Sequence, residues 1–160
     1  MSDRTGIMLT TLALLGAGLV AGVFFGFSTF IMRALDRLPT DQSILAMQSI
    51  NITVITPLFM AVLFGTGLLG AYLAVVAFRF GLDAHSGIIM FAALAYIIGV
   101  IGVTLVFSVP LNDGLASLQA QSTDAASYWK SFVASWTYWN HVRCGFAILS
   151  CLAFASALRA

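Results

Sequence analysis

Four long runs without a charged residue dominate this sequence, and they limit what the chain can fold into. The runs cover residues 5–32, 42–78, 86–111 and 144–158. A membrane helix needs about 20 mostly apolar residues, so the first three runs predict transmembrane helices, and the last run does so together with the residues just before it. The whole chain has 160 residues and is only 8% charged, whereas a soluble domain carries about 25% charged residues. We therefore expect an integral membrane protein of one domain.

The runs predict an all-α fold, a bundle of four transmembrane helices with both termini on the same side. The expected spans lie at about residues 7–32, 57–78, 86–109 and 137–158. The second run is longer than one span needs, and Pro57 is expected to break or kink its helix. Pro110 is expected to end the third helix. By a small margin, the Lys and Arg residues favour cytoplasmic termini in a bacterial cytoplasmic membrane.

With this topology, unusual polar residues from separate parts of the chain meet at the end opposite the termini. These residues are Arg33, Gln48, Asn51, Asn112, Asp113, Trp136, Asn140, His141 and Arg143. Their convergence predicts a polar pocket between helix ends, roofed by the connection over residues 112–130. The alternative interpretation is a purely structural hydrogen-bond network.

The last run is preceded by the most informative stretch, residues 136–143. Trp136, Trp139, Asn140 and Arg143 stand at positions i, i+3, i+4 and i+7, so a helix places them on one face. A guanidinium inside a membrane helix is costly and normally faces protein, water or a ligand. The alternative is that Arg143 extends to the lipid headgroups while the tryptophans lie at the interface.

The residues at this end suit a flat, acidic and apolar ligand. Arg143 could hold an anion, and either His141 or Asp113 could take a proton. The candidate substrate-binding residues are Asn51, Asn112, Trp136, Trp139, Asn140, Phe27 and Gln48. Structural alternatives remain for several of them, because Asn112 or Asp113 could cap a helix, His141 could point to the interface and Asn51 could satisfy the break at Pro57.

Metal binding finds little support in the sequence. A metal centre needs several convergent His, Cys or carboxylate ligands. The chain has no glutamate, and the polar end offers only His141 and Asp113. We therefore predict no metal and no cofactor.

The partners follow from the same composition. A net charge of +1 gives no reason to expect nucleic acid. We expect membrane lipid and a small hydrophobic aromatic ligand instead. Gly18, Gly22 and Gly26 recur every four residues, a pattern that favours close helix approach, within the chain or between copies in a homo-oligomer.

Four short blocks together resemble the anthrone-oxygenase-like family of small four-span membrane proteins. The blocks are residues 24–28 (FFGFS), residues 47–51 (MQSIN) with Pro57, residues 109–113 (VPLND), and Trp136-x-x-Trp-Asn-x-x-Arg143. The resemblance implies oxidation of an anthrone to an anthraquinone, with O₂ as co-substrate and no cofactor. Two other classes remain open: a non-catalytic binding module or helper subunit, and an enzyme with a metal or haem that the sequence does not reveal.

Overall fold

The computed structural model describes residues 3–80 and 83–159, and all the regular structure in these ranges is helical. The elements are α1 (Asp3–Gly26), η1 (Phe27–Ile31), α2 (Met32–Leu35), α3 (Thr40–Thr53), α4 (Pro57–Phe80), α5 (Ala84–Tyr96), η2 (Ile97–Gly102), η3 (Thr104–Ser108), α6 (Val109–Ala116) and α7 (Ala125–Ala157). The three η elements are π-helical turns within longer helices. The all-α prediction is confirmed for these residues.

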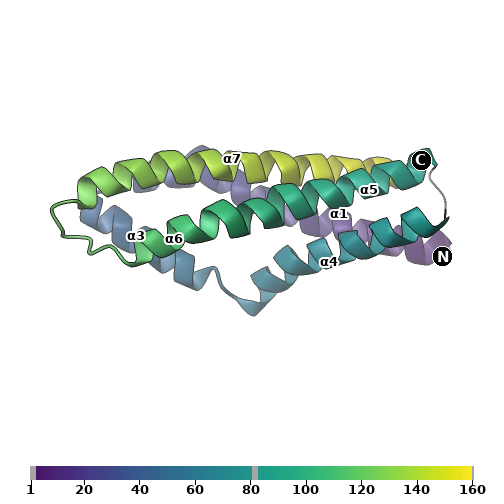
Figure 1. Cartoon of the computed structure of the whole chain (residues 1–160), viewed down its shortest axis with the longest axis horizontal. Coiled ribbons are helices and arrows are strands. Elements are labelled where there is room, and N and C mark those ends of the chain that lie inside the picture. Colours follow the sequence, from purple (N-terminus) through teal and green to yellow (C-terminus); the bar gives the residue numbers. More distant parts are fainter. Residues whose placement is uncertain (1–2, 81–82, 160) are drawn as a thin grey trace.

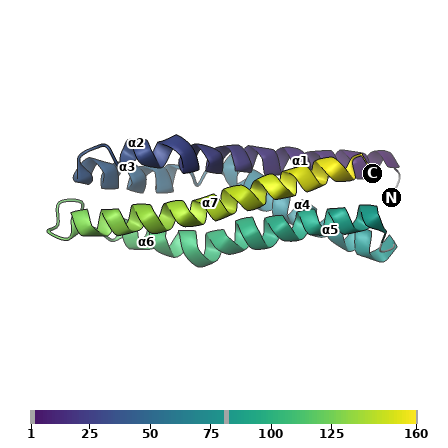
Figure 2. The same ribbon diagram turned by 90° about the horizontal axis from the view of Figure 1, so that it is seen from above.

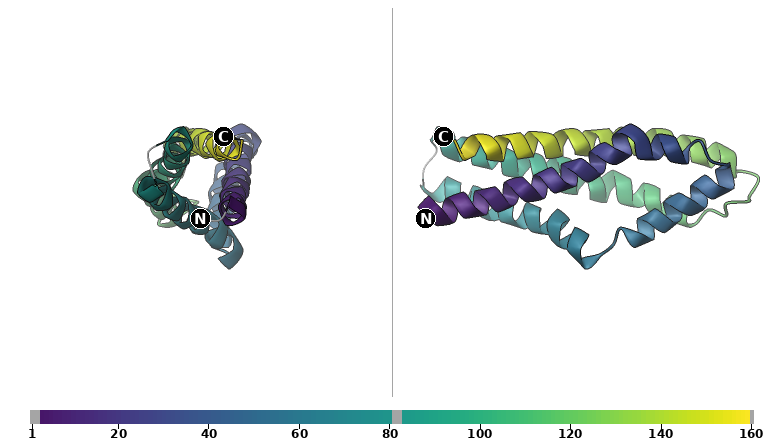
Figure 3. Two further views of the ribbon diagram at one scale, coloured as in Figure 1. Left: turned by 90° about the vertical axis from the view of Figure 1, so that its right-hand side faces the viewer. Right: turned by 180° about the vertical axis from the view of Figure 1, so that it is seen from behind.

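Four long helical segments run side by side along the long axis of the molecule: α1 to α2, α4, α5 to α6, and α7 (Figure 1). α7 packs against both α1 and α5, and it lies between them when the molecule is viewed from above (Figure 2). α4 also packs against α1 and α5, which closes the ring seen end-on in Figure 3. α1 begins and α7 ends at the same end of the molecule, here called the termini end. The opposite end is the loop end.

Three helices are long and apolar enough to cross a membrane, judged by length and composition. They cover Arg4–Leu35, Pro57–Arg79 and His85–Ala116. Much of their apolar surface points outward, as Leu12, Leu15 and Leu19 show on α1, where each side chain is more than half exposed. An outward apolar surface of this kind matches a lipid environment better than water.

The second charge-free run is divided at Pro57, as predicted. α3 ends at Thr53, and α4 begins at Pro57 after a short connection that forms an outward corner (Figures 1 and 3). Proline suits the first turn of a helix because it has no N–H to leave unpaired. The side chain of Thr56 accepts a hydrogen bond from the Phe59 N–H at 3.2 Å and so caps the new helix. This corner widens the bundle on one side.

Pro110 does not end the third helix, in contrast to the prediction. The helix continues through α6 to Ala116. The reason is the π-helical turn before it, in which the Val109 N–H bonds to the Thr104 carbonyl, five residues earlier. Pro110 then lies in the first turn of α6, where a missing N–H costs little.

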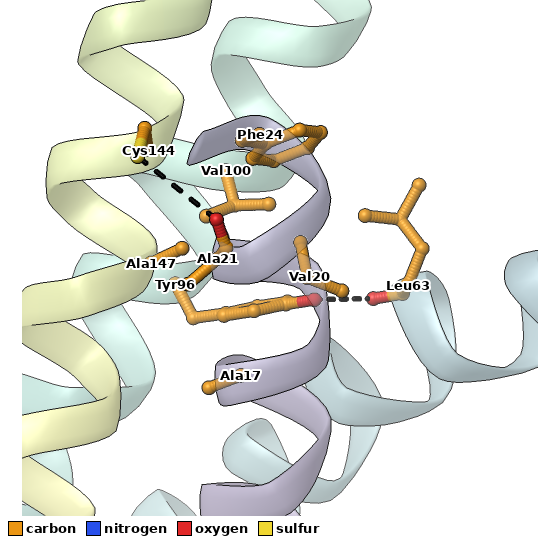
Figure 4. Close-up of a cluster of buried hydrophobic side chains, with 9 residues drawn as sticks. All are labelled: Ala17, Val20, Ala21, Phe24, Leu63, Tyr96, Val100, Cys144 and Ala147. Atoms are coloured by element: carbon orange, nitrogen blue, oxygen red, sulfur yellow. Dashed lines mark hydrogen bonds between the residues drawn. The ribbon is translucent and has the colours of Figure 1, made fainter. Parts of the chain in front are cut away.

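The centre of the bundle is held by a cluster of small and aromatic side chains, shown in Figure 4. Ala17, Ala21 and Ala147 let α1 and α7 approach closely. The Tyr96 hydroxyl is buried and donates a hydrogen bond to the Leu63 carbonyl at 3.1 Å, which links α5 to α4. Two further apolar clusters fill the loop end and the termini end.

The glycine stripe of α1 does not form a continuous contact within the chain. Gly22 is exposed, and a Cβ atom added there would meet no atom within 4 Å. The tightest glycine contacts lie elsewhere: an added Cβ at Gly99 would collide with the Phe146 ring, and one at Gly16 would collide with Thr66. Close helix approach therefore depends on Gly99 of η2 and on Gly16, while Gly22 faces outward.

Candidate functional site

A cavity of about 210 Å³ lies beside the α3–α4 corner, where α1, α3, α4, η3, α6 and α7 meet. Its lining is mainly apolar, and the aromatic members are Phe24, Phe27, Phe59, Phe64 and Trp136. The polar members are Asn51, Thr104, Ser108, Asn112 and Arg143. Small-molecule sites are commonly of this kind, with an apolar cavity and a few placed polar groups.

The cavity has an apolar rim, which we define as Val23, Ile55, Phe64, Leu105 and Val109. All five line the cavity and are large hydrophobic side chains exposed on the outer surface. Ile55 belongs to the α3–α4 corner and is 67% exposed. All the exposed residues of the described lining are therefore apolar, whereas its polar residues are buried or half-buried.

Among the residues that the structure describes, Arg143 is the only charged one in the cavity lining, and its side chain is just 5% exposed. Its Nη2 donates to Asn140 Oδ1 at 2.9 Å, and its Nη1 lies 3.4 Å from Thr104 Oγ1. Its guanidinium carbon lies 4.4 Å from the centre of the Phe24 ring and 5.3 Å from that of Trp136. Neutral dipoles and aromatic faces thus surround this buried cation.

Asn140 holds Arg143 in place from the same helix, three residues earlier. It is fully buried, and its Nδ2 donates to the Phe24 carbonyl and to Ser28 Oγ, both at 2.8 Å. Its Oδ1 remains free to accept from Arg143. One amide therefore ties α7 to the end of α1 and fixes the direction of the guanidinium.

Trp136 and Asn112 form the second fixed pair of the lining. Trp136 Nε1 donates to Asn112 Oδ1 at 2.9 Å, which joins α7 to α6. The Trp136 ring also packs against Phe27 at a centroid distance of 5.3 Å. These contacts build one aromatic wall of the cavity.

Three buried side-chain atoms of the lining have no protein partner: Asn51 Nδ2, Ser108 Oγ and Arg143 Nε. Buried polar atoms in proteins nearly always have hydrogen-bond partners. Each of these three groups can donate a hydrogen bond. Together they would suit a ligand that carries oxygen acceptors.

Five of the predicted site residues meet at this cavity, namely Phe27, Asn51, Asn112, Trp136 and Arg143, and Asn140 lies directly behind them. Four others lie elsewhere. His141 and Asp113 are exposed and do not line the cavity, while Trp139 stacks on Phe107 at a centroid distance of 3.5 Å. Gln48 donates to the carbonyls of Leu115 and Leu118 at 2.8 and 3.0 Å, and so ties α3 to the end of α6.

The cavity lies deeper in the bundle than we predicted. Of the expected roof, residues 112–130, only Asn112 lines it. An apolar cluster occupies the space toward the loop end, with Leu35, Ile44, Leu115, Trp129 and Phe132 among its buried members. The site is thus bounded by helix sides and by the α3–α4 corner, and the connection after Asn112 does not cover it.

Thr104 and Ser108 are site residues that our sequence reasoning missed. With Asn112 they recur every four residues, so the signal was a polar stripe within an apolar run. The π-helical turns offer no such signal, yet η1 contributes Phe27 and η3 contributes Thr104 and Ser108 to the cavity. π-Helical turns often occur at functional sites.

Among the described residues, no group of three or more His, Cys, Asp or Glu side chains could hold a metal ion.

Comparison with known protein families gives one decisive match. The model of the anthrone oxygenase family matches residues 54–153. This chain belongs to the anthrone oxygenase family. The matched region of this family member includes Ser108, Asn112, Trp136 and Arg143, so it contains most of the polar lining of the cavity. No curated protein and no solved structure matches the chain.

Proposed function

We propose that the protein is a membrane-bound oxygenase that oxidises a small aromatic molecule, anthrone-like or quinone-like, with O₂. The reaction would take place in the cavity beside Arg143 and need no further cofactor. The observation that carries this proposal is a buried arginine without an acidic partner, facing an aromatic cavity in a member of the anthrone oxygenase family. In this proposal α7 is a fourth span, because it packs against α1 and α5.

The chemistry needs few protein groups. An anthrone has an acidic central CH₂ group, because its anion is a delocalised phenolate. This anion can pass one electron to O₂, and recombination of the two radicals gives a peroxide. Loss of one water from the protonated peroxide leaves the quinone carbonyl, so CH₂ and O₂ become C=O and H₂O.

Arg143 would stabilise the negative charge at each stage of this sequence. A buried cation acts strongly there, since the surrounding apolar groups screen it little. Asn51 and Ser108 would orient the oxygens of the substrate through their unpartnered atoms. Trp136 and the phenylalanines of the lining would stack on its rings.

The test is O₂ consumption by the purified protein with an anthrone, measured for the wild type and for Arg143→Gln and Arg143→Lys. We expect Arg143→Gln to lower kcat/KM at least about a hundredfold, as does loss of a group that stabilises a developing oxyanion. Arg143→Lys should restore little, because an ammonium cannot reproduce the planar fork that Asn140 and Thr104 hold. Arg79→Gln is the matched control, since Arg79 is an exposed arginine at the far end of α4.

The same measurement separates this proposal from its rivals. A protein that folds but consumes no O₂ with any anthrone would favour a binding module or helper subunit. Wild-type turnover in Arg143→Gln would refute the role given to the arginine. Turnover that is lost on treatment with a chelator and restored by a metal ion would favour a metal enzyme.

A further inference from the structure

The charge of Arg143 has no counter-ion in the cavity. Its hydrogen-bond partners, Asn140 and Thr104, are both neutral, and its Nε has no partner among the residues that the structure describes. Within residues 3–80 and 83–159, no aspartate and no histidine lines the cavity. A buried unpaired charge is costly, whereas the same charge paired with an anion is stabilised.

The cavity also offers no protein group that could take a proton at neutral pH. The two titratable side chains in the cluster beneath it are Tyr96 and Cys144, and neither lines the cavity. The Tyr96 hydroxyl points to the Leu63 carbonyl and the Cys144 thiol to the Ala21 carbonyl (Figure 4). All the other charged or titratable side chains that the structure describes lie outside the lining: Arg4, Arg33, Asp36, Arg37, Asp41, Tyr72, Arg79, Asp83, His85, Asp113, Asp124, Tyr128, Lys130, Tyr138, His141, Cys151 and Arg159.

We propose that the cavity binds its aromatic ligand as an oxyanion, and that the proton of the ligand is released to water and not to a protein side chain. The inference rests on the proposed function only for the class of ligand, a flat molecule with an acidic OH or CH group. The balance is simple: the neutral acid HA gives a bound A⁻ beside Arg143 and one H⁺ in the aqueous phase. The anion becomes the missing counter-ion of the arginine.

Two opposing effects decide whether the anion is favoured. An apolar cavity alone would raise the pKa of a phenol, because burial disfavours the charged form. A cation within about 4–6 Å has the opposite effect and lowers such a pKa by about one to three units. Three unpartnered donors, on Asn51, Ser108 and Arg143, would add to the second effect because they bind the anion better than the neutral form.

The experiment titrates a coloured ligand instead of following turnover. The probe is 4-nitro-1-naphthol, whose naphtholate absorbs at longer wavelength than its neutral form. It is titrated with pH in the presence of excess wild-type protein in detergent, and in protein-free micelles of the same detergent. We expect the midpoint of ionisation to fall by about one to three pH units when the probe is bound.

Variants identify the source of the shift. Arg143→Gln should move the midpoint above the value in protein-free micelles, because the apolar cavity then acts alone. Arg143→Lys should keep part of the decrease, since it keeps the charge. Arg79→Gln, His141→Asn and Asp113→Asn should all keep the full decrease. A smaller decrease in His141→Asn or Asp113→Asn would show that one of these groups does take the proton.

A second probe covers the case in which Arg143→Gln fails to fold. The methyl ether of the same naphthol cannot ionise, and we expect wild-type protein to bind it at least about tenfold more weakly than the naphtholate. Equal binding of the two probes, an unchanged or raised midpoint, or no binding of the naphthol would overturn the inference. Because O₂ consumption with an anthrone is measured separately, such a result leaves the proposed oxygenase activity to stand or fall by itself.

Discussion

At the scale of single residues, the geometry of the site depends strongly on the side-chain amide of Asn140. Asn140 makes three hydrogen bonds, to the Phe24 carbonyl, to Ser28 and to Arg143. Phe24 and Arg143 line the cavity, and Ser28 belongs to η1, the element that also contributes Phe27 to the lining. The guanidinium can point into the cavity because this amide occupies its other side.

We expect Asn140→Ala to lower the free energy of unfolding by about 2–4 kcal/mol, since buried hydrogen-bonding groups then lose their partner. Thermal unfolding in detergent, followed by circular dichroism, measures the effect. Gln121→Ala is the control because Gln121 is an exposed amide. Equal stability of the two variants would show that water molecules replace the Asn140 amide. Water would then reach this position although the Asn140 side chain is buried.

Residue spacing predicted one part of the site and could not predict another. Trp136, Asn140 and Arg143 share one face of α7, as their positions required. His141 is one residue after Asn140, which turns it about 100° away around the helix, and it faces the outer surface instead. Asp113 is likewise next to Asn112 but exposed. Chemical suitability alone did not reveal which of two neighbouring residues points inward.

At the scale of whole elements, interruptions in the helices shape the cavity. The break before Pro57 and the π-helical turns η1 and η3 all lie beside it. The break was predictable because proline has a strong local effect. The π-helical turns were not, since they leave no periodic signal in the sequence. For the same reason, the continuation of the helix through Pro110 was missed.

Glycine positions give a prediction at this scale. Gly99→Ala should destabilise the protein by about 1–3 kcal/mol, because the added methyl group collides with the Phe146 ring. Gly22→Ala should be neutral or slightly stabilising, since it meets open space and alanine favours a helix. Thermal midpoints in detergent compare the two directly. A larger loss for Gly22→Ala would point to a contact of this face with a second copy of the chain.

At the scale of the whole molecule, the bundle is longer than the apolar part of a bilayer. The candidate spans Arg4–Leu35 and His85–Ala116 each have 32 residues. At 1.5 Å per residue each is about 48 Å long, against about 30 Å of hydrocarbon. The remaining candidate span, Pro57–Arg79, begins only after α3. We therefore expect α3 and the loop end to project beyond the hydrocarbon. The cavity would then lie near the level where lipid chains meet their headgroups.

Topology can be tested with single cysteines in a background that lacks Cys144 and Cys151. The four-span proposal places positions 37 and 124 on one side of the membrane and positions 4 and 159 on the other. All four native side chains are exposed. A membrane-impermeant maleimide added to intact cells should label one pair and not the other. Labelling of positions 4 and 159 from opposite sides would mean that α7 does not cross the membrane.

The apolar rim of the cavity has a consequence for how the protein meets its ligand. In a membrane, a rim of Val23, Ile55 and three other exposed apolar side chains would open toward lipid. The bilayer would then serve as the reservoir from which the proposed site is filled. Occupancy would be governed by the number of ligand molecules per lipid molecule, and the volume of the surrounding water would matter little. Growth of the membrane would lower occupancy by dilution in two dimensions, even when the cell holds the same amount of ligand and protein.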